Sequence, residues 1–241
     1  MFFFLPFTEI LLLYILAAIL PAIFLLQYIY RLDTIEKEPA YLLLRLLFCG
    51  VGAAICSILL EQVGQGILDA MVSQQSPHYI LFLAFLVVAV VEEGMKLFFL
   101  KRCSWRDPNF DYLFDGIVYA VFTSLGFAAF ENIIYVFNYG LSVSIPRAIF
   151  AIPGHLSFSV FLGIFYGRAK RCEIHGNRFG CYRNLLLGYL CAVFLHGFYD
   201  TCAMIGTAPA NAIFLIFIIL LYSLVYRMVR KASQYDRPIY Q

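Results

Sequence analysis

The chain has 241 residues, of which 63% are hydrophobic and only 13% are charged, and its formal net charge is +2. Soluble domains are roughly half apolar and about a quarter charged, so this composition excludes an ordinary soluble protein and indicates a polytopic membrane protein. The length suits one membrane-embedded domain over residues 1–241. The small net charge gives no reason to expect a nucleic-acid partner.

Long apolar stretches recur along the whole chain, and a helix needs about 20 such residues to cross the hydrocarbon layer. Seven stretches reach this length, which predicts an all-α bundle of about seven transmembrane helices. The predicted spans cover 7–30, 41–68, 79–100, 114–138, 146–167, 184–205 and 209–228.

The distribution of positive charge predicts how this bundle is oriented. Of the 17 lysines and arginines, all but two lie beside the first, third or fifth connection or at the C-terminal end. The exceptions are Arg147, on the opposite side, and Lys96, inside a predicted span. Cytoplasmic loops have an excess of Lys and Arg, so we expect the C-terminus in the cytoplasm and, with seven spans, the N-terminus outside.

Seven cysteines are scattered through apolar segments and through loops that we expect to be cytoplasmic. Disulfides are rare in the cytoplasm, and disulfide frameworks are typical of small secreted domains. The sequence therefore predicts no disulfide framework.

The third span contains three charged residues, Glu92, Glu93 and Lys96, in an otherwise apolar stretch. A single charge at this depth costs about 2.5–3.5 kcal/mol on insertion scales, so such residues are functional candidates. Glu92 and Lys96 are four residues apart and share a helix face, and Glu93 lies about 100° around the axis. Lys96 neutralises one of the two carboxylates, and the other carboxylate is available for general acid–base chemistry. The alternative is a Glu–Lys pair that only fixes packing.

Polar groups also interrupt the next three spans. Glu131 and Asn132 lie beyond the middle of the fourth span, and His155 follows a Pro-Gly pair in the fifth. Because proline leaves a backbone carbonyl unpaired, and free backbone polarity is tolerated only against protein or water, His155 is expected beside a wet cavity. In the sixth span His196 and Asp200 are one turn apart, which suits an oriented imidazole, a metal ligand or a plain hydrogen bond.

Four motifs on these successive spans resemble those of the PrsW family of bacterial intramembrane proteases. They are EEGMK (92–96) for EExxK, GFAAFEN (126–132) for FxxxE, PGHLSF (153–158) with its isolated histidine, and HGFYD (196–200) for HxxxD. The four occur in the family's order, so the motif-bearing core spans about 79–205. The family resemblance also implies distant kinship with the CAAX prenyl endopeptidases and Abi membrane proteins.

The resemblance implies a multi-pass protease of the bacterial cytoplasmic membrane. Its substrate class would be a single-span membrane protein, an anti-sigma factor cut at site 1, so that a sigma factor is later released in a stress response. The catalytic residues would be Glu92, Glu93, Glu131, His155 and His196, supported by Lys96, Asn132 and Asp200. Asp200 replaces an asparagine of some relatives, which leaves the oxyanion-binding group open among Asn132, His155 and a protonated His196.

Two mechanisms of peptide hydrolysis are compatible with these residues. In the metal-free form, which we favour on the sequence, Glu92 or Glu93 activates water and the two histidines stabilise the oxyanion. In the other form the histidines, with Glu131 or Asp200, bind zinc. A different class of function also fits, because proton-coupled transporters use buried Glu, His and Asp groups. A membrane scaffold without catalysis is a third interpretation.

Overall fold

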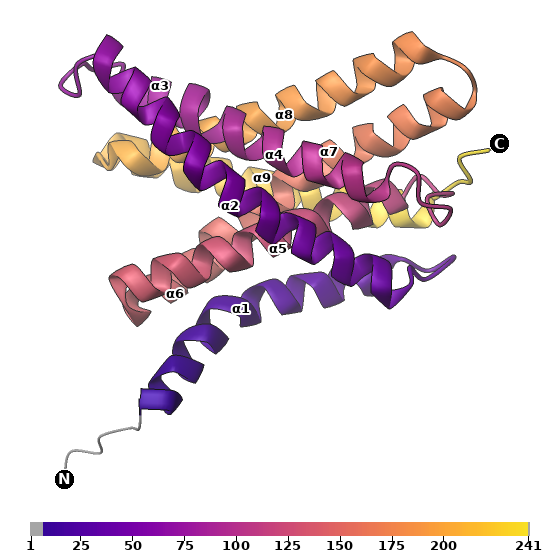
Figure 1. Cartoon of the computed structure of the whole chain (residues 1–241), viewed down its shortest axis with the longest axis horizontal. Helices are drawn as coiled ribbons and strands as arrows, with labels where there is room; N and C mark the ends of the chain where they lie inside the picture. The colour runs from indigo at the N-terminus through magenta and orange to yellow at the C-terminus, as the bar shows by residue number, and fades with distance from the viewer. Residues whose placement is uncertain (1–6, 241) are drawn as a thin grey trace.

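The protein is described by a computed structural model that covers residues 7–240, and all of its regular elements are helices. The long helices are joined by short connections, and Figure 1 shows them crossing one another in a single bundle. The elements are α1 (Phe7–Leu32), α2 (Ala40–Met71), α3 (Tyr79–Phe82), η1 (Leu83–Ala89), α4 (Val90–Ser104), α5 (Asp115–Tyr139), η2 (Leu141–Val143), α6 (Ser144–Pro146), η3 (Arg147–Ala151), α7 (Ile152–Ile174), α8 (Arg178–Ile205) and α9 (Ala208–Gln234).

Several of these elements follow one another without a break, so the described chain forms seven long rods. Six rods are long and apolar enough to cross a membrane, and these correspond to all predicted spans except the third. The third rod, α3–η1–α4, contains three charged residues, Glu92, Glu93 and Lys96, within its apolar stretch, which is more charge than the other six rods have in theirs. The predicted all-α polytopic membrane bundle is confirmed.

Several predicted boundaries differ from the structure, most of all at the end of the fifth span. The hydrophilic stretch 167–184 was expected to be a loop, but α7 continues to Ile174 and α8 begins at Arg178. The turn between them is short, and Gly176 takes a φ of 74°, which a side chain would disfavour. The basic residues of this stretch therefore lie mostly on the ends of α7 and α8 and not in a long loop.

Helix α5 lies at the centre of the bundle, and small residues allow its neighbours to approach closely. A Cβ added to Gly126 would lie 2.3 Å from the carbonyl oxygen of Leu47 on α2. A Cβ on Gly116 would lie 2.6 Å from the carbonyl oxygen of Gly163 on α7. Close backbone contact of this kind is how membrane helices gain packing energy. It holds α2, α5 and α7, three helices that contribute to the site, in fixed positions.

The connections that contain most of the basic residues meet at one end of the bundle. Trp105, after α4, donates a hydrogen bond to Glu173 near the end of α7 over 2.8 Å. The backbone of Leu113, before α5, donates to the carbonyl of Arg237, after α9, over 3.0 Å. We call this end the basic face, and the positive-inside rule predicts that it is cytoplasmic.

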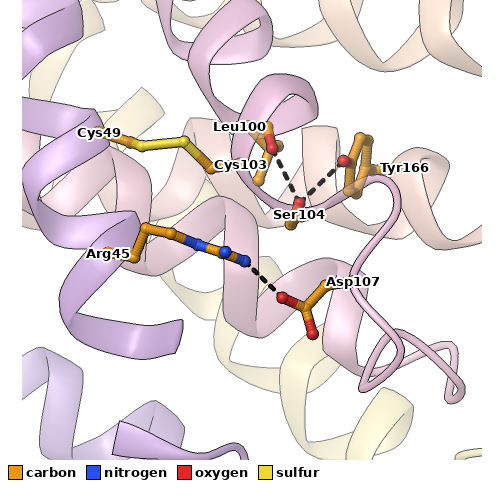
Figure 2. Close-up of a disulfide and its surroundings, with 7 residues drawn as sticks. All are labelled: Arg45, Cys49, Leu100, Cys103, Ser104, Asp107 and Tyr166. Carbon is orange, nitrogen blue, oxygen red and sulfur yellow. Dashed lines mark hydrogen bonds and ion pairs between the residues drawn. A yellow bond between two sulfur atoms is a disulfide. The ribbon is translucent and has the colours of Figure 1, made fainter. Parts of the chain in front are cut away.

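A disulfide joins Cys49 of α2 to Cys103 near the end of α4 (Figure 2). The sequence predicted no disulfide framework among the cysteines, and it gave no indication of this single pair. The two residues are far apart in sequence, with a separation of 54, but the packing of α2 on α4 places their side chains together. No sequence pattern indicates this pairing, because it depends on how the two helices cross.

Candidate active site

A cavity of about 550 Å³ lies between helices α2, α4, α5, α7, α8 and α9. Its lining includes Arg147, Met204 and Asn211, which are close to the connections at the end opposite the basic face. The cavity is therefore in the half of the bundle that we expect to face outward. The ionisable residues along its wall include Glu61, Glu92, Glu131, Arg147, His155, His196 and Asp200.

Lys96 is the centre of a buried polar cluster at one side of this cavity. Its Nζ lies 2.7 Å from Oε1 of Glu93, 3.0 Å from Oε2 of Glu92 and 3.0 Å from Nδ1 of His155. The ammonium also lies 4.2 Å from the centre of the Phe127 ring. Because Lys96 has three hydrogens, each of its polar neighbours can accept one of them. The lysine thereby links α4 to α7 and balances one of two adjacent carboxylates.

His155 connects this cluster to a second ion pair. Its Nε2 lies 3.0 Å from Oε2 of Glu131, and the same oxygen lies 3.0 Å from Nη2 of Arg147. The Nε of Arg147 donates to Oδ1 of Asn132 over 2.7 Å, and Nδ2 of Asn132 donates to the carbonyl of Ala18 over 2.8 Å. This chain of contacts fixes the ring of His155 from both of its nitrogens and ties α5 to α7 and α1.

His196 faces the same cluster from α8. Its Nδ1 lies 2.9 Å from Oε1 of Glu93, and its Nε2 lies 3.3 Å from Oδ2 of Asp200 and 3.9 Å from Oε2 of Glu92. The ring stacks on Phe158, with 4.9 Å between the centroids. Three carboxylates around one imidazole make a strongly anionic environment for this ring.

The helices that present Glu92 and His155 both have a π-helical turn immediately before the functional residues. The segment η1 ends at Ala89, three residues before Glu92, and η3 ends at Ala151, shortly before Pro153 and His155. Such turns insert one extra residue and change the direction in which the following side chains point. The helix irregularity expected at Pro153 is present, and it lies on the wall of the cavity.

The structure brings the predicted site residues together, but they occupy two layers. Glu92, Glu131, His155, His196 and Asp200 line the cavity. Glu93, Lys96 and Asn132 do not line the cavity; they are buried behind that wall, at 1%, 2% and 0% exposure. Both polar atoms of the Asn132 amide are engaged, so its use as an oxyanion donor is disfavoured.

Sequence reasoning missed two charged residues of the cavity wall. Glu61 of α2 was visible only as a charge near the end of a long span, and Arg147 only as the single basic residue on the outer side. One oxygen of Glu61, Oε1, is buried without a hydrogen-bond partner. A charge within a predicted span is the signal that would have identified both residues.

The arrangement includes a set of donors suited to a metal ion. Glu92, His155 and His196 each offer a ligand atom, and the three atoms lie within 4.8 Å of one another. Two ligands about 2.0–2.1 Å from a tetrahedral zinc ion are separated by roughly 3.3 Å, so small movements would suffice. The wall also has four carboxylates, Glu61, Glu92, Glu131 and Asp200, against one permanent cation, Arg147. Donor chemistry and excess negative charge both fit a divalent cation.

Comparison with known proteins identifies the family of this chain. The family model described as "PrsW family intramembrane metalloprotease" matches residues 38–226. A Geobacillus kaustophilus protein named Protease PrsW is 31% identical over 92% of this chain and 93% of its own length. Proteins of the same name from Bacillus subtilis and Clostridioides difficile are 31% and 28% identical, covering 90% and 93% of this chain and 94% and 93% of their own lengths.

No solved structure matches this chain. The family model nevertheless covers most of the sequence, including all four motifs and every ionisable residue of the cavity wall. The relatives are similar in length over nearly the whole chain and share one name. The chain is a membrane protease that belongs to the PrsW family.

Proposed function

We propose that this protease cuts a peptide bond of a single-span membrane protein at the outer side of a bacterial cytoplasmic membrane. We further propose that the substrate is an anti-sigma factor, as the family resemblance implies. The observation that supports hydrolysis most directly is the meeting of Glu92, His155 and His196, from three different rods, at one cavity. The position of that cavity near the outer connections supports cleavage on that side.

In the proposed mechanism Glu92 is the general base, because it lines the cavity whereas Glu93 is buried behind it. Glu92 takes a proton from water, and the resulting hydroxide attacks the carbonyl carbon of the scissile bond. When the C–N bond breaks, the same proton passes from Glu92 to the leaving amine. Glu93 is then a positioning residue, which holds Lys96 and His196 through its Oε1.

The tetrahedral intermediate has a negatively charged oxygen that needs preorganised donors. Arg147 lines the cavity with a permanent positive charge, and Glu131 and Asn132 fix its guanidinium. We propose that Arg147 stabilises this oxygen from the outer side. Its contacts on two sides hold the donor in place before the substrate enters.

We also propose that the enzyme works with a divalent metal ion, which one oxygen of Glu92 would hold together with His155 and His196 while the other oxygen serves as the base, as the family description and the donor set suggest. Such an ion, when bound, polarises a carbonyl group and makes bound water more acidic. Glu93 holds His196 through Nδ1 and Glu131 holds His155 through Nε2, so the other nitrogen of each ring would be the one that binds the ion. The metal-free preference drawn from the sequence is not retained in this proposal.

The test is cleavage of a single-span substrate in proteoliposomes by the purified enzyme. The variant Glu92→Gln should reduce the rate by about 10³-fold or more, since general-base and metal-ligand roles are both removed. The matched control is Glu36→Gln, an exposed residue between α1 and α2, which should leave the rate unchanged. If Glu92→Gln retained the wild-type rate, or if it abolished proton-linked uptake without affecting cleavage, the proposal would fail. Replacing the anti-sigma substrate by an unrelated single-span protein separately tests the substrate class.

A further inference from the structure

A second cavity, of about 790 Å³, lies at the basic face between the start of α2 and the end of α4. It shares no lining residue with the active-site cavity. Its lining includes four cationic side chains and one carboxylate, an excess of three positive charges. We call it the cationic pocket, and these five residues are Arg45, Lys101, Arg102, Arg106 and Asp107.

The walls of the cationic pocket are held in place by bonds between α2 and the end of α4. Arg45 of α2 pairs with Asp107, and the disulfide Cys49–Cys103 joins the same two segments (Figure 2). Trp105, which also lines the pocket, is 8% exposed and packs against Tyr166 of α7. The pocket is therefore preformed, which reduces the entropy that a ligand must overcome on binding.

Most of the positive charge in the pocket is not neutralised by the protein. Arg102 and Arg106 are exposed and have no ion-pair or hydrogen-bond partner within residues 7–240. Lys101 lies 5.3 Å from the centre of the Trp105 ring and has no carboxylate partner in the same range. An anion with several oxygens could bind these guanidinium and ammonium groups at once.

The pocket also has an apolar side. Leu97 and Phe98 of α4 line it one to two turns before the arginines, and the Phe98 side chain is 58% exposed. A position at the helix ends, with cations on one side and apolar residues toward the hydrocarbon, corresponds to the headgroup layer of a bilayer. A free phosphate or an acidic peptide would use the cations but would leave the apolar side exposed.

We propose that the cationic pocket binds the phosphodiester headgroup of an anionic glycerophospholipid. The phosphate oxygens accept hydrogen bonds from Arg102 and Arg106, and the acyl chains lie against Leu97 and Phe98. Basic pockets between membrane helices on the cytoplasmic side are suited to anionic headgroups. This proposal is independent of the active site and of the protease substrate.

The chain offers a direct probe, because Trp105 is its only tryptophan and lines the pocket. Phosphatidylglycerol with brominated acyl chains is titrated into the purified full-length protein in detergent, and Trp105 fluorescence is followed. We expect saturable quenching by this lipid, and brominated phosphatidylcholine to need about 30-fold more lipid for the same quenching. Equal quenching by the two lipids would overturn the proposal.

The double variant Arg102→Gln/Arg106→Gln should raise the Kd for brominated phosphatidylglycerol about 30-fold, since it removes two cations. The charge-matched control is Arg227→Gln/Arg230→Gln at the end of α9, outside the pocket, which should leave the Kd within twofold. Equal affinity of the two double variants would contradict the assignment. Displacement of the lipid by millimolar inorganic phosphate or by an acidic peptide would identify an anion or peptide site instead.

Discussion

The ammonium of Lys96 and the ring of His155 are in direct contact, with 3.0 Å between Nζ and Nδ1. Because an ammonium has only donors, Nδ1 of His155 must be the acceptor, and the ring hydrogen is then on Nε2. That hydrogen points to Oε2 of Glu131, 3.0 Å away. Two contacts thus fix the tautomer and the orientation of His155, and both contributing residues lie on other helices. A metal ion held by His155 would need the Nδ1 lone pair, so it would replace the Lys96 contact and leave the hydrogen on Nε2.

Removing the charge of Lys96 should damage both folding and catalysis. Lys96→Gln leaves the buried carboxylates Glu92 and Glu93 without their shared cation, and breaking a buried pair costs about 3–5 kcal/mol. We expect a lower midpoint of thermal unfolding in detergent and loss of cleavage. Lys231→Gln, exposed near the end of α9 and outside both cavities, is the control and should change neither quantity. A Lys96→Gln protein as stable as the wild type would show that the ion pairs of Lys96 contribute little to folding stability.

The contribution of Arg147 to catalysis should depend on the shape of its guanidinium group as well as on its positive charge. Its guanidinium contacts Glu131 through Nη2 and Asn132 through Nε, and a lysine has no second nitrogen for this. We expect Arg147→Lys to lower kcat about 10-fold and Arg147→Gln about 100-fold or more, with little change in KM. The measurement is steady-state cleavage in proteoliposomes. Full activity of Arg147→Gln would show that Arg147 does not stabilise the oxyanion of the tetrahedral intermediate.

The connection between α1 and α2 should make stability depend on pH. Burial raises the pKa of Glu38 from 4.5 to about 8, although Tyr119 donates a hydrogen bond to it. Because the folded-state pKa is above the unfolded value, the protonated carboxyl stabilises the fold fully below about pH 4.5, and this contribution is lost as pH rises through about 8. Unfolding should therefore become easier between these limits.

The variant Glu38→Gln should flatten this pH dependence, since an amide does not titrate. Chemical unfolding in detergent micelles at several pH values measures the slope. Burial also raises the pKa of Asp33 to about 6, so a smaller slope should persist at lower pH. The exposed Glu36→Gln control should retain the wild-type slope. Identical slopes for wild type and Glu38→Gln would contradict the argument.

Two glycines should respond to substitution in opposite directions. A side chain at Gly126 would meet the backbone of Leu47 at 2.3 Å, so Gly126→Val should force α2 and α5 apart and destabilise the fold by about 1–3 kcal/mol or more. Gly66, on α2, has nothing within 4 Å of an added Cβ. Gly66→Ala should be neutral or stabilise by roughly 0.5–1 kcal/mol, because alanine favours a helix. Thermal unfolding of both variants checks the contrast.

The helical rods and the polar residues of the site were predictable from the sequence, for a physical reason. Apolar stretches long enough to cross a bilayer leave few alternatives, and each intramembrane charge is conspicuous against them. Glu92, Glu131, His155 and His196 were identified in this way, together with their motifs. How these residues divide into two layers was not predictable, because that depends on helix rotation.

The rotation of the helices about their axes also determines features of the site that the sequence does not indicate. The π-helical turns η1 and η3 alter the facing of the residues after them, and neither has a periodicity signal. Glu61 and Arg147 reach the cavity because α2 and the start of the fifth rod are turned inward. The pairing of Cys49 with Cys103 likewise depends on where two helices cross.

We propose that Glu92, His155 and His196, from separate helices, form one hydrolytic centre that holds a metal ion. The most direct test is elemental analysis of the purified, active protease beside Glu92→Gln, His155→Ala and His196→Ala, with cleavage measured on the same samples. We expect about one divalent ion per chain in the wild type and joint loss of ion and cleavage in each variant. Full cleavage by a wild-type enzyme without bound metal, or undiminished metal in all three variants, would contradict this account.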